Sequence, residues 1–210
     1  MDIKVCGLKY EANIKELSLF DINYMGFIFY KNSARYISNA ISFDFIRTIP
    51  KHIKKVGVFV NEPTYGIINS VAQYNLDYVQ LHGDESELNC SELKPYVKII
   101  KAFRIKDDFD FNHLKNYLPY VDFFLFDTDT KNYGGSGQQF NWDLLKQYDL
   151  DKPFFLSGGI DEASLDKLKS FNHPQLYAID INSKFEIEPA LKDSKKIKQF
   201  ITKLKQNDNT

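Results

Sequence analysis

Two side chains in this sequence could exchange protons with a substrate. Cys6 ends a short apolar run near the N-terminus, and Asp127 directly follows the wholly apolar stretch 123–126. A free thiol, with a pKa near ~8.5, is mostly protonated at neutral pH, so it acts as a base only where its anion is stabilised. A carboxyl group at the end of an apolar strand is costly to bury alone, so it is either hydrogen-bonded structurally or held protonated as an acid. Such a thiol and such a carboxyl would form an acid–base pair.

Each polar residue also has a structural interpretation. A cysteine at the end of a strand can be an inert, packed thiol, and we assign Cys90, within the helical stretch 88–93, to packing. Arg35 could pair with a carboxylate on a neighbouring helix, or it could bind a substrate carboxylate through its fork of donors. His82 follows another apolar run and is interpreted as a polar residue lining the site. Position in the sequence alone leaves these alternatives open.

Three loops rich in glycine or small polar residues follow the sixth, seventh and eighth apolar runs. They contain Gly134, Gly135, Ser136 and Gly137, then Ser157, Gly158 and Gly159, then Asn182 and Ser183. Glycine lets backbone N–H groups approach an anion closely, and a following helix N-terminus favours negative charge. Either pair of glycines could simply form a tight turn. Their occurrence together, after neighbouring runs, favours a phosphate site bound by backbone amides.

The elements that must position these residues are eight short apolar runs, most of them rich in β-branched or aromatic residues, as buried parallel strands are. The runs are 3–6, 24–29, 56–60, 78–81, 98–103, 123–126, 154–156 and 176–181. Helically spaced segments lie between them, which predicts a parallel sheet, and the count of eight favours closure into a single-domain (β/α)8 TIM barrel over residues 1–210. An open doubly wound sheet is the alternative. The short connection 103–123 predicts a reduced helix after the fifth strand.

Composition bounds the function. The chain carries 27 Lys and Arg against 28 Asp and Glu, which argues against nucleic acid or an anionic membrane as its main partner. Two cysteines make no disulfide framework, and neither a signal peptide nor a run of ~18 apolar residues is visible, so we expect a cytoplasmic enzyme. The C-terminal segment places Ile197, Phe200 and Ile201 on one face among lysines. We interpret it as an outer barrel helix rather than a membrane-surface helix.

Motifs for a cofactor or a metal are not found. No Gly-x-Gly-x-x-Gly follows the first run, so a nicotinamide dinucleotide site has no support. The spacing of Cys6, His82 and Asp127 is not that of a metal site. The sequence therefore predicts acid–base chemistry on a small phosphorylated molecule.

With these residues in place, the sequence closely resembles the phosphoribosylanthranilate isomerase family, barrels of tryptophan biosynthesis. The matching blocks are KVCGLK at 4–9, GFIFYKNSARYIS at 26–38, VGVFVNE at 56–62, VQLHGDE at 79–85, FDT at 126–128, YGGSGQQFNW at 133–142, LSGGI at 156–160 and DINSKFE at 180–186. Any one block is weak, but the ordered set covers nearly the whole chain and is specific.

The resemblance implies an Amadori rearrangement of a phosphoribosyl anthranilate. It implies that Asp127 is the general acid that opens the ribose ring and that Cys6, as thiolate, removes the C2 proton. It places Arg35 against the anthranilate carboxylate and His82 in the pocket wall. The phosphate would be bound by Gly135, Ser136, Gly158, Gly159, Asn182 and Ser183. Members of the family need no cofactor or metal, and the resemblance leaves a monomer or a homodimer open.

The sequence departs from the family pattern in one loop that bears on binding. Asn182, Ser183 and Lys184 stand where Ser-Ser-Gly is common, which weakens the case for that loop as a phosphate ligand. Two competing interpretations remain: another sugar-phosphate barrel, such as a ribulose-phosphate epimerase or an indole-glycerol-phosphate synthase, and a catalytically silent phosphate-binding barrel. The metal ligands of the first and the catalytic lysines of the second enzyme are not visible, and intact Cys6 and Asp127 argue against the silent barrel.

Overall fold

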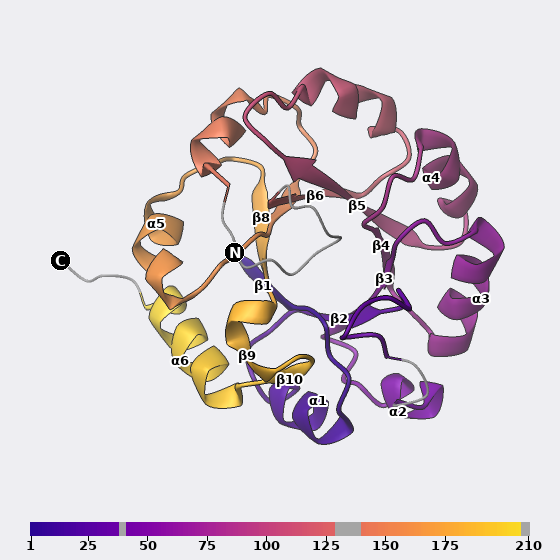
Figure 1. Ribbon diagram of the computed structural model, residues 1–210, viewed down its shortest axis with the longest axis vertical. Coiled ribbons are helices and arrows are strands. Elements are labelled where there is room, and N and C mark those ends of the chain that lie inside the picture. Colours follow the sequence, from indigo (N-terminus) through magenta and orange to yellow (C-terminus); the bar gives the residue numbers. More distant parts are fainter. Residues whose placement is uncertain (38–40, 129–139, 207–210) are drawn as a thin grey trace.

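The computed structural model describes residues 1–37, 41–128 and 140–206. At its centre eight parallel strands form a closed barrel, in which each strand pairs with the next along the chain and the last pairs with the first (Figure 1). The strands are β1 (Asp2–Val5), β2 (Tyr24–Ile28), β3 (Lys54–Phe59), β4 (Tyr78–Leu81), β5 (Lys98–Ile105), β6 (Phe123–Thr128), β7 (Phe154–Leu156) and β8 (Leu176–Ile181). The prediction of a barrel is confirmed, and the alternative of an open doubly wound sheet is wrong.

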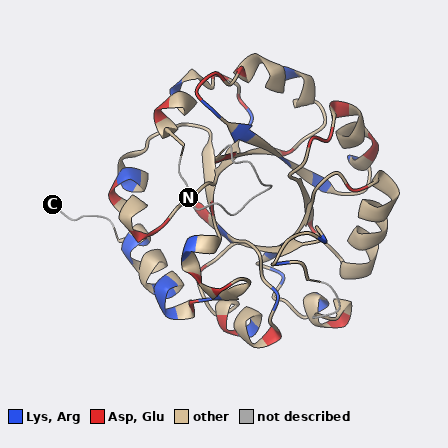
Figure 2. Cartoon of the chain, in the orientation of Figure 1, with Lys and Arg blue, Asp and Glu red and all other residues tan. Residues whose placement is uncertain are grey.

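Helices surround the barrel, with a short hairpin after β8 (Figure 1). They are α1 (Glu11–Leu17), α2 (Phe43–Arg47), α3 (Thr64–Tyr74), α4 (Glu87–Leu93), α5 (Leu165–Ser170) and α6 (Ser194–Lys205), with the 3-10 helices η4 (Glu162–Ser164) and η5 (Ser183–Phe185), and the hairpin is β9 (Glu186–Glu188) and β10 (Leu191–Lys192). Helix α6 buries Ile197, Phe200 and Ile201 on one face, which confirms it as an outer barrel helix. Both signs of charge occur around the outer ring in the view of Figure 2. Among the described residues, no helix has the length and apolarity needed to cross a membrane.

The helices that follow β5 and β6 are 3-10 helices. They are η2 (Phe111–Tyr117) and η3 (Trp142–Gln147). Aromatic rings hold this side of the barrel together: Phe111 contacts both Phe126 and Tyr148 at centroid distances of 5.9 Å, and Phe126 lies 5.2 Å from Tyr148. The expected reduction of the helix after the fifth strand is confirmed, because a 3-10 helix with i→i+3 turns stands there in place of an α-helix. This helix, η2, buries three side chains.

The inward-facing side chains of the strands are apolar at the N-terminal end of the barrel, its base, and mostly polar at the C-terminal end. At the base, Tyr24, Tyr78, Phe123 and Phe155 pack with ring centroids between 5.1 and 6.0 Å apart. Side chains two positions apart on a strand point the same way. The register that buries these rings therefore directs the residues near the C-terminal ends of the strands, among them His82, into the opposite opening of the barrel.

Candidate active site

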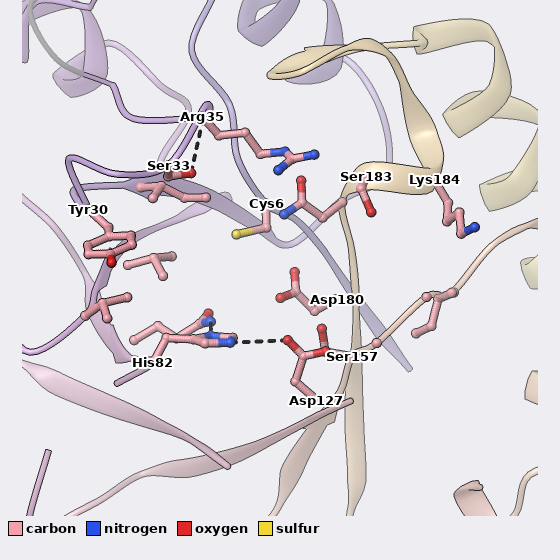
Figure 3. A pocket seen from close by; sticks show the side chains of 18 residues that line it. Cys6, Tyr30, Ser33, Arg35, His82, Asp127, Ser157, Asp180, Ser183 and Lys184 are labelled. Carbon is pink, nitrogen blue, oxygen red and sulfur yellow. Dashed lines mark hydrogen bonds and ion pairs between the residues drawn. The ribbon is translucent and has the colours of Figure 1, made fainter. Parts of the chain in front are cut away.

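A pocket opens at the C-terminal ends of the barrel strands (Figure 3). The space between its walls is about 810 Å³ with the open mouth included. The lining includes every described residue that the sequence analysis assigned to the site: Cys6, Arg35, His82, Asp127, Gly158, Gly159, Asn182 and Ser183. The two remaining candidates, Gly135 and Ser136, lie outside the described residues. Within the described ranges, no three His, Cys, Asp or Glu side chains are grouped to hold a metal ion.

Cys6 lies at the end of β1 on the inner wall of the barrel. Its backbone N–H donates to the carbonyl of Ile181 at 2.9 Å, and the residue is 4% exposed. The neighbouring strand makes room for it: a Cβ on Gly26 of β2 would lie 2.7 Å from Sγ of Cys6 and 3.0 Å from its Cα. A glycine at position 26 is therefore what lets the thiol lie against β2.

Replacing Gly26 with alanine is expected to lower kcat/KM by about 100-fold while the chain still folds, because a shift of the order of 1 Å misplaces the thiol. The measurement is kcat/KM beside a denaturation curve. Gly66→Ala in α3 is the matched control: its Cβ would meet only the carboxylate end of Glu62, a movable side chain. Gly66→Ala is expected to leave kcat/KM unchanged, and equal losses in the two variants would contradict the role of Gly26.

The charges around Cys6 come mainly from a buried ion pair. Nζ of Lys4 lies 2.9 Å from both carboxylate oxygens of Asp180, and the lysine side chain is fully buried. Burial raises the pKa of the Cys6 thiol, and the positive charges of Lys4 and Lys192 oppose that rise. Burial alone would lower the pKa of Lys4, but Asp180 and Cys6 raise it above its ordinary value. Lys4 is thus a buried cation near the thiol, and its charge opposes the effect of burial on the thiol pKa.

Asp127 and His82 lie side by side on neighbouring parts of the pocket wall (Figure 3). Nε2 of His82 is 3.2 Å from Oδ2 of Asp127, and both side chains are largely buried. Nδ1 of His82 lies 2.7 Å from Nε2 of the buried Gln80. With that amide donating to Nδ1, the ring proton is on Nε2 and faces the carboxyl group. The second oxygen of Asp127, Oδ1, accepts from the backbone N–H of Thr128 at 2.8 Å.

The loop after β7 brings backbone close to Asp127. Gly158 has φ +88° and Gly159 has φ +65°, a region that favours glycine. A Cβ on Gly158 would lie 2.3 Å from Oγ1 of Thr128 and 3.1 Å from Oδ1 of Asp127. This turn needs glycine for its conformation and for its close packing. The two interpretations from the sequence, a tight turn and an anion-binding loop, are compatible here because the turn faces the pocket.

Two lysines from later in the chain hydrogen-bond to the loop after β8. Oδ1 of Asn182 accepts from Nζ of Lys192 at 2.7 Å, and the carbonyl of Lys184 accepts from Nζ of Lys196 at 2.6 Å. Ser183 begins η5, a helix of three residues. Lys184 is an exposed residue at the rim of the pocket, so it adds a positive charge where the family commonly has glycine.

Arg35 is paired with a carboxylate in the wall of the pocket. Its Nε lies 2.8 Å from Oε1 of Glu186, and one Nη lies 2.6 Å from Oε2. The partner is in β9, a strand, and not on a neighbouring helix as one of the two sequence alternatives had it. Glu186 also accepts from the buried Lys192, and the pKa of the Glu186 carboxyl is lowered because these two cations outweigh its burial. A guanidinium has five donors, so Arg35 can contact a second carboxylate as well.

Sequence reasoning missed five polar residues of this region. They are Lys4, Gln80, Asp180, Glu186 and Lys192. The first three share one signal. Each is a buried polar residue within a barrel strand, and a site residue follows it two places later, on the same face of the strand. The last two lie in the hairpin after β8, for which the sequence offered no pattern.

Comparison with known proteins agrees with this geometry. The profile of the family described as N-(5'phosphoribosyl)anthranilate (PRA) isomerase matches residues 3–203. A protein of Parabacteroides distasonis named N-(5'-phosphoribosyl)anthranilate isomerase is 44% identical, covering 97% of this chain and 93% of its own length.

Two solved structures are similar over almost the whole chain. A phosphoribosyl anthranilate isomerase in complex with reduced 1-(o-carboxyphenylamino)-1-deoxyribulose 5-phosphate is 28% identical with a TM-score of 0.82, covering 98% of each chain. Monomers generated from the dimeric enzyme of Thermotoga maritima are 28% identical with a TM-score of 0.79, covering 99% of this chain and 100% of theirs. The resemblance seen in the sequence is confirmed, and the chain belongs to the N-(5'-phosphoribosyl)anthranilate isomerase family.

Proposed function

We propose that the chain converts N-(5'-phosphoribosyl)anthranilate to 1-(2-carboxyphenylamino)-1-deoxyribulose 5-phosphate by acid–base catalysis, a step of tryptophan biosynthesis. One observation carries the proposal: Cys6 from β1 and Asp127 from β6 line a single pocket together with Arg35 and the Gly158–Gly159 turn. A base, an acid, a donor for a carboxylate and an anion-binding turn are the groups that this rearrangement requires. Membership in the isomerase family supports the choice of substrate.

In the first step, Asp127 acts as the general acid. Its carboxyl proton goes to the ring oxygen of the ribose, the bond between that oxygen and C1 breaks, and the nitrogen lone pair forms a protonated Schiff base. The hydrogen bond from the Thr128 N–H holds one oxygen of the carboxyl group, and Nε2 of His82 lies 3.2 Å from the other. A general acid placed in this way contributes typically ~10²–10⁴ in rate.

In the second step, Cys6 acts as the general base. Its thiolate takes the C2 proton, and the C–H electrons form the C1–C2 double bond of an enolamine while the nitrogen loses its positive charge. Loss of the C2 hydroxyl proton and protonation of C1 then give the ketone, so no atom is gained or lost overall. Neither step needs a metal ion or an organic cofactor.

The anthranilate and the phosphate of the substrate would be bound on opposite sides of Cys6 and Asp127. We assign the anthranilate carboxylate to Arg35 and the phosphate to Gly158 and Gly159, with Gly135, Ser136, Asn182 and Ser183 as further candidates. The positive φ angles of Gly158 and Gly159 and the cation of Lys184 at the rim support the phosphate end.

The chain is also proposed to act in the cytoplasm, as one domain, either as a monomer or as a homodimer. The dimeric state of the Thermotoga maritima relative makes the homodimer a specific expectation. Light scattering on the purified chain, run at several concentrations, distinguishes the two states.

A fluorescence assay tests the function directly. Purified protein is mixed with N-(5'-phosphoribosyl)anthranilate, and the loss of substrate fluorescence is followed together with the appearance of the ketone product. Conversion at a rate proportional to enzyme is expected. Absence of conversion by a folded protein, or turnover of a pentulose phosphate lacking the anthranilate group, would overturn the proposal in favour of the other barrel activities.

Replacing Arg35 with alanine is expected to weaken binding of the carboxylate-bearing product by about 10- to 100-fold, the range for a lost charge-assisted hydrogen bond, and to leave plain ribose 5-phosphate nearly unaffected. Dissociation constants from calorimetry for both ligands provide the test. Arg47→Ala on α2, an exposed arginine outside the pocket, is the control and should change neither constant. Equal losses for both ligands would show that Arg35 does not bind the carboxylate.

A further inference from the structure

The proposed mechanism needs a thiolate, but the fold surrounds Cys6 with conditions that favour the neutral thiol. The residue is 4% exposed, and burial raises the pKa of its thiol. Without a compensating positive charge, too little thiolate would form near neutral pH for the thiol to work as a base. A group that offsets burial must therefore lie within reach of the sulfur.

Lys4 is placed to be that group. Lys4 in β1 lies two positions before Cys6, so the two side chains point the same way, and the buried ammonium group of Lys4 is a charge that acts on the thiol. The β1–β8 register pairs Lys4 with Asp180, and both carboxylate oxygens of Asp180 lie 2.9 Å from Nζ. Asp180 also lines the pocket, and in Figure 3 it lies between Cys6 and Asp127.

Four charged groups act on the thiol. Lys4 acts from its own strand, Asp180 from β8, Lys192 from β10 and Arg35 from the segment after β2. Arg35 and Lys192 share the carboxylate of Glu186, which reduces their effect. Of the positive charges near Cys6, that of Lys4 opposes the effect of burial on the thiol pKa the most.

A purely structural role would be a poor explanation for this pair. Buried ion pairs are weak sources of stability, because desolvation of the two charges offsets their attraction. The Lys4–Asp180 pair acts on the Cys6 thiol, and its aspartate lines the pocket. An apolar pair at these positions could not stabilise a thiolate.

We propose that Lys4 is a positioning residue for Cys6: its ammonium group, anchored by Asp180, supplies the positive charge that stabilises the thiolate once the thiol proton has left for solvent. Lys4 does this from inside the barrel. The inference concerns how the base of the proposed function is produced, and it rests on that function for its role in turnover. Its direct effect, on the ionisation of Cys6, is measurable without any substrate.

The experiment is the pH dependence of Cys6 alkylation by iodoacetamide. Lys4→Met removes the charge at similar length and is expected to move the midpoint of alkylation up by at least about one pH unit, since a neighbouring opposite charge shifts a pKa by ~1–3 units. Lys4→Met leaves Asp180 alone in the interior, so Lys4→Met/Asp180→Asn is tested beside it. Replacing both members of a buried pair is often neutral for stability, and the same direction of shift is expected in the double variant.

Lys55→Met is the matched control. Lys55 is a buried lysine on β3 that pairs with Asp77 at 3.0 Å, and it does not line the pocket. Its replacement should leave the midpoint of alkylation at the wild-type value. Cys6→Ala gives the background, which should be low because Cys90 is fully buried with a pKa of about 12.

The outcomes separate the two proposals. If both Lys4 variants alkylate with the wild-type midpoint, Lys4 is only a core ion pair and the inference fails, whatever the isomerase assay gives. If the midpoint shifts but wild-type protein does not convert phosphoribosylanthranilate, the proposed function fails and the effect of Lys4 on Cys6 stands. If both hold, the acidic limb of kcat/KM should move with the alkylation midpoint in Lys4→Met and not in Lys55→Met.

Discussion

Replacing Cys6 with alanine is expected to lower kcat by at least ~10²-fold, and by up to ~10⁴-fold, because it removes the only base that the proposed mechanism uses at C2. Cys6→Ser should be almost as poor, since a hydroxyl does not ionise near neutral pH. Both variants should fold, because the thiol is small and the hydrogen bond from its backbone N–H to Ile181 is unaffected. The measurement is kcat on protein whose far-UV spectrum and unfolding curve match those of the wild type.

The second cysteine provides the control for this prediction. Cys90 is fully buried in α4 and belongs to the hydrophobic core, away from the pocket. Cys90→Ala should leave kcat unchanged and lower the free energy of unfolding, as expected when a small cavity is made in a core. A Cys6→Ala protein with wild-type kcat would remove Cys6 from the mechanism.

Replacing Asp127 with asparagine is expected to lower kcat by a similar ~10²–10⁴-fold, because an amide has no proton to give to the ribose ring oxygen. The amide oxygen can still accept the hydrogen bond from the Thr128 N–H, so the end of β6 should keep its position. Binding of the product should therefore change much less than kcat. Single-turnover kinetics together with product affinity separate the two effects.

The opposite end of the same strand holds a matched carboxylate. Oδ2 of Asp122 accepts from the backbone N–H of Ile99 at 2.8 Å, and this residue directly precedes β6 and does not line the pocket. Asp122→Asn should keep full activity. If Asp127→Asn retained wild-type turnover, or if Asp122→Asn lost it equally, the assignment of the general acid would be wrong.

Much of this arrangement was predictable because barrel geometry converts a linear pattern into a site. Eight apolar runs separated by helical segments predict the closed barrel, and polar residues at the C-terminal ends of those runs must then meet at one opening. Cys6, His82 and Asp127 meet there for that reason, although they are far apart in the sequence. The loops that would bind phosphate follow the same logic, since parallel strands end on the same side.

The interactions that tune these residues were not predictable in the same way. Lys4 and Asp180 are 176 positions apart, and only the β1–β8 register brings them together. The partner of Arg35 depends on a hairpin after β8 whose fold follows from tertiary contacts. A single sequence contains the residue types at these positions but not the strand register that pairs them.

The 3-10 helices η2 and η3 have a consequence for the way the barrel opens in solution. Short i→i+3 turns protect fewer amides than α-helices do, so hydrogen exchange should be faster at η2 and η3 than at α3 or α6. The aromatic cluster of Phe111, Phe126 and Tyr148 is one of the apolar contacts that oppose such opening. This sector of the wall is therefore expected to be the first cooperative unit to open under native conditions, while β1 and β8, with the Lys4–Asp180 pair between them, exchange last.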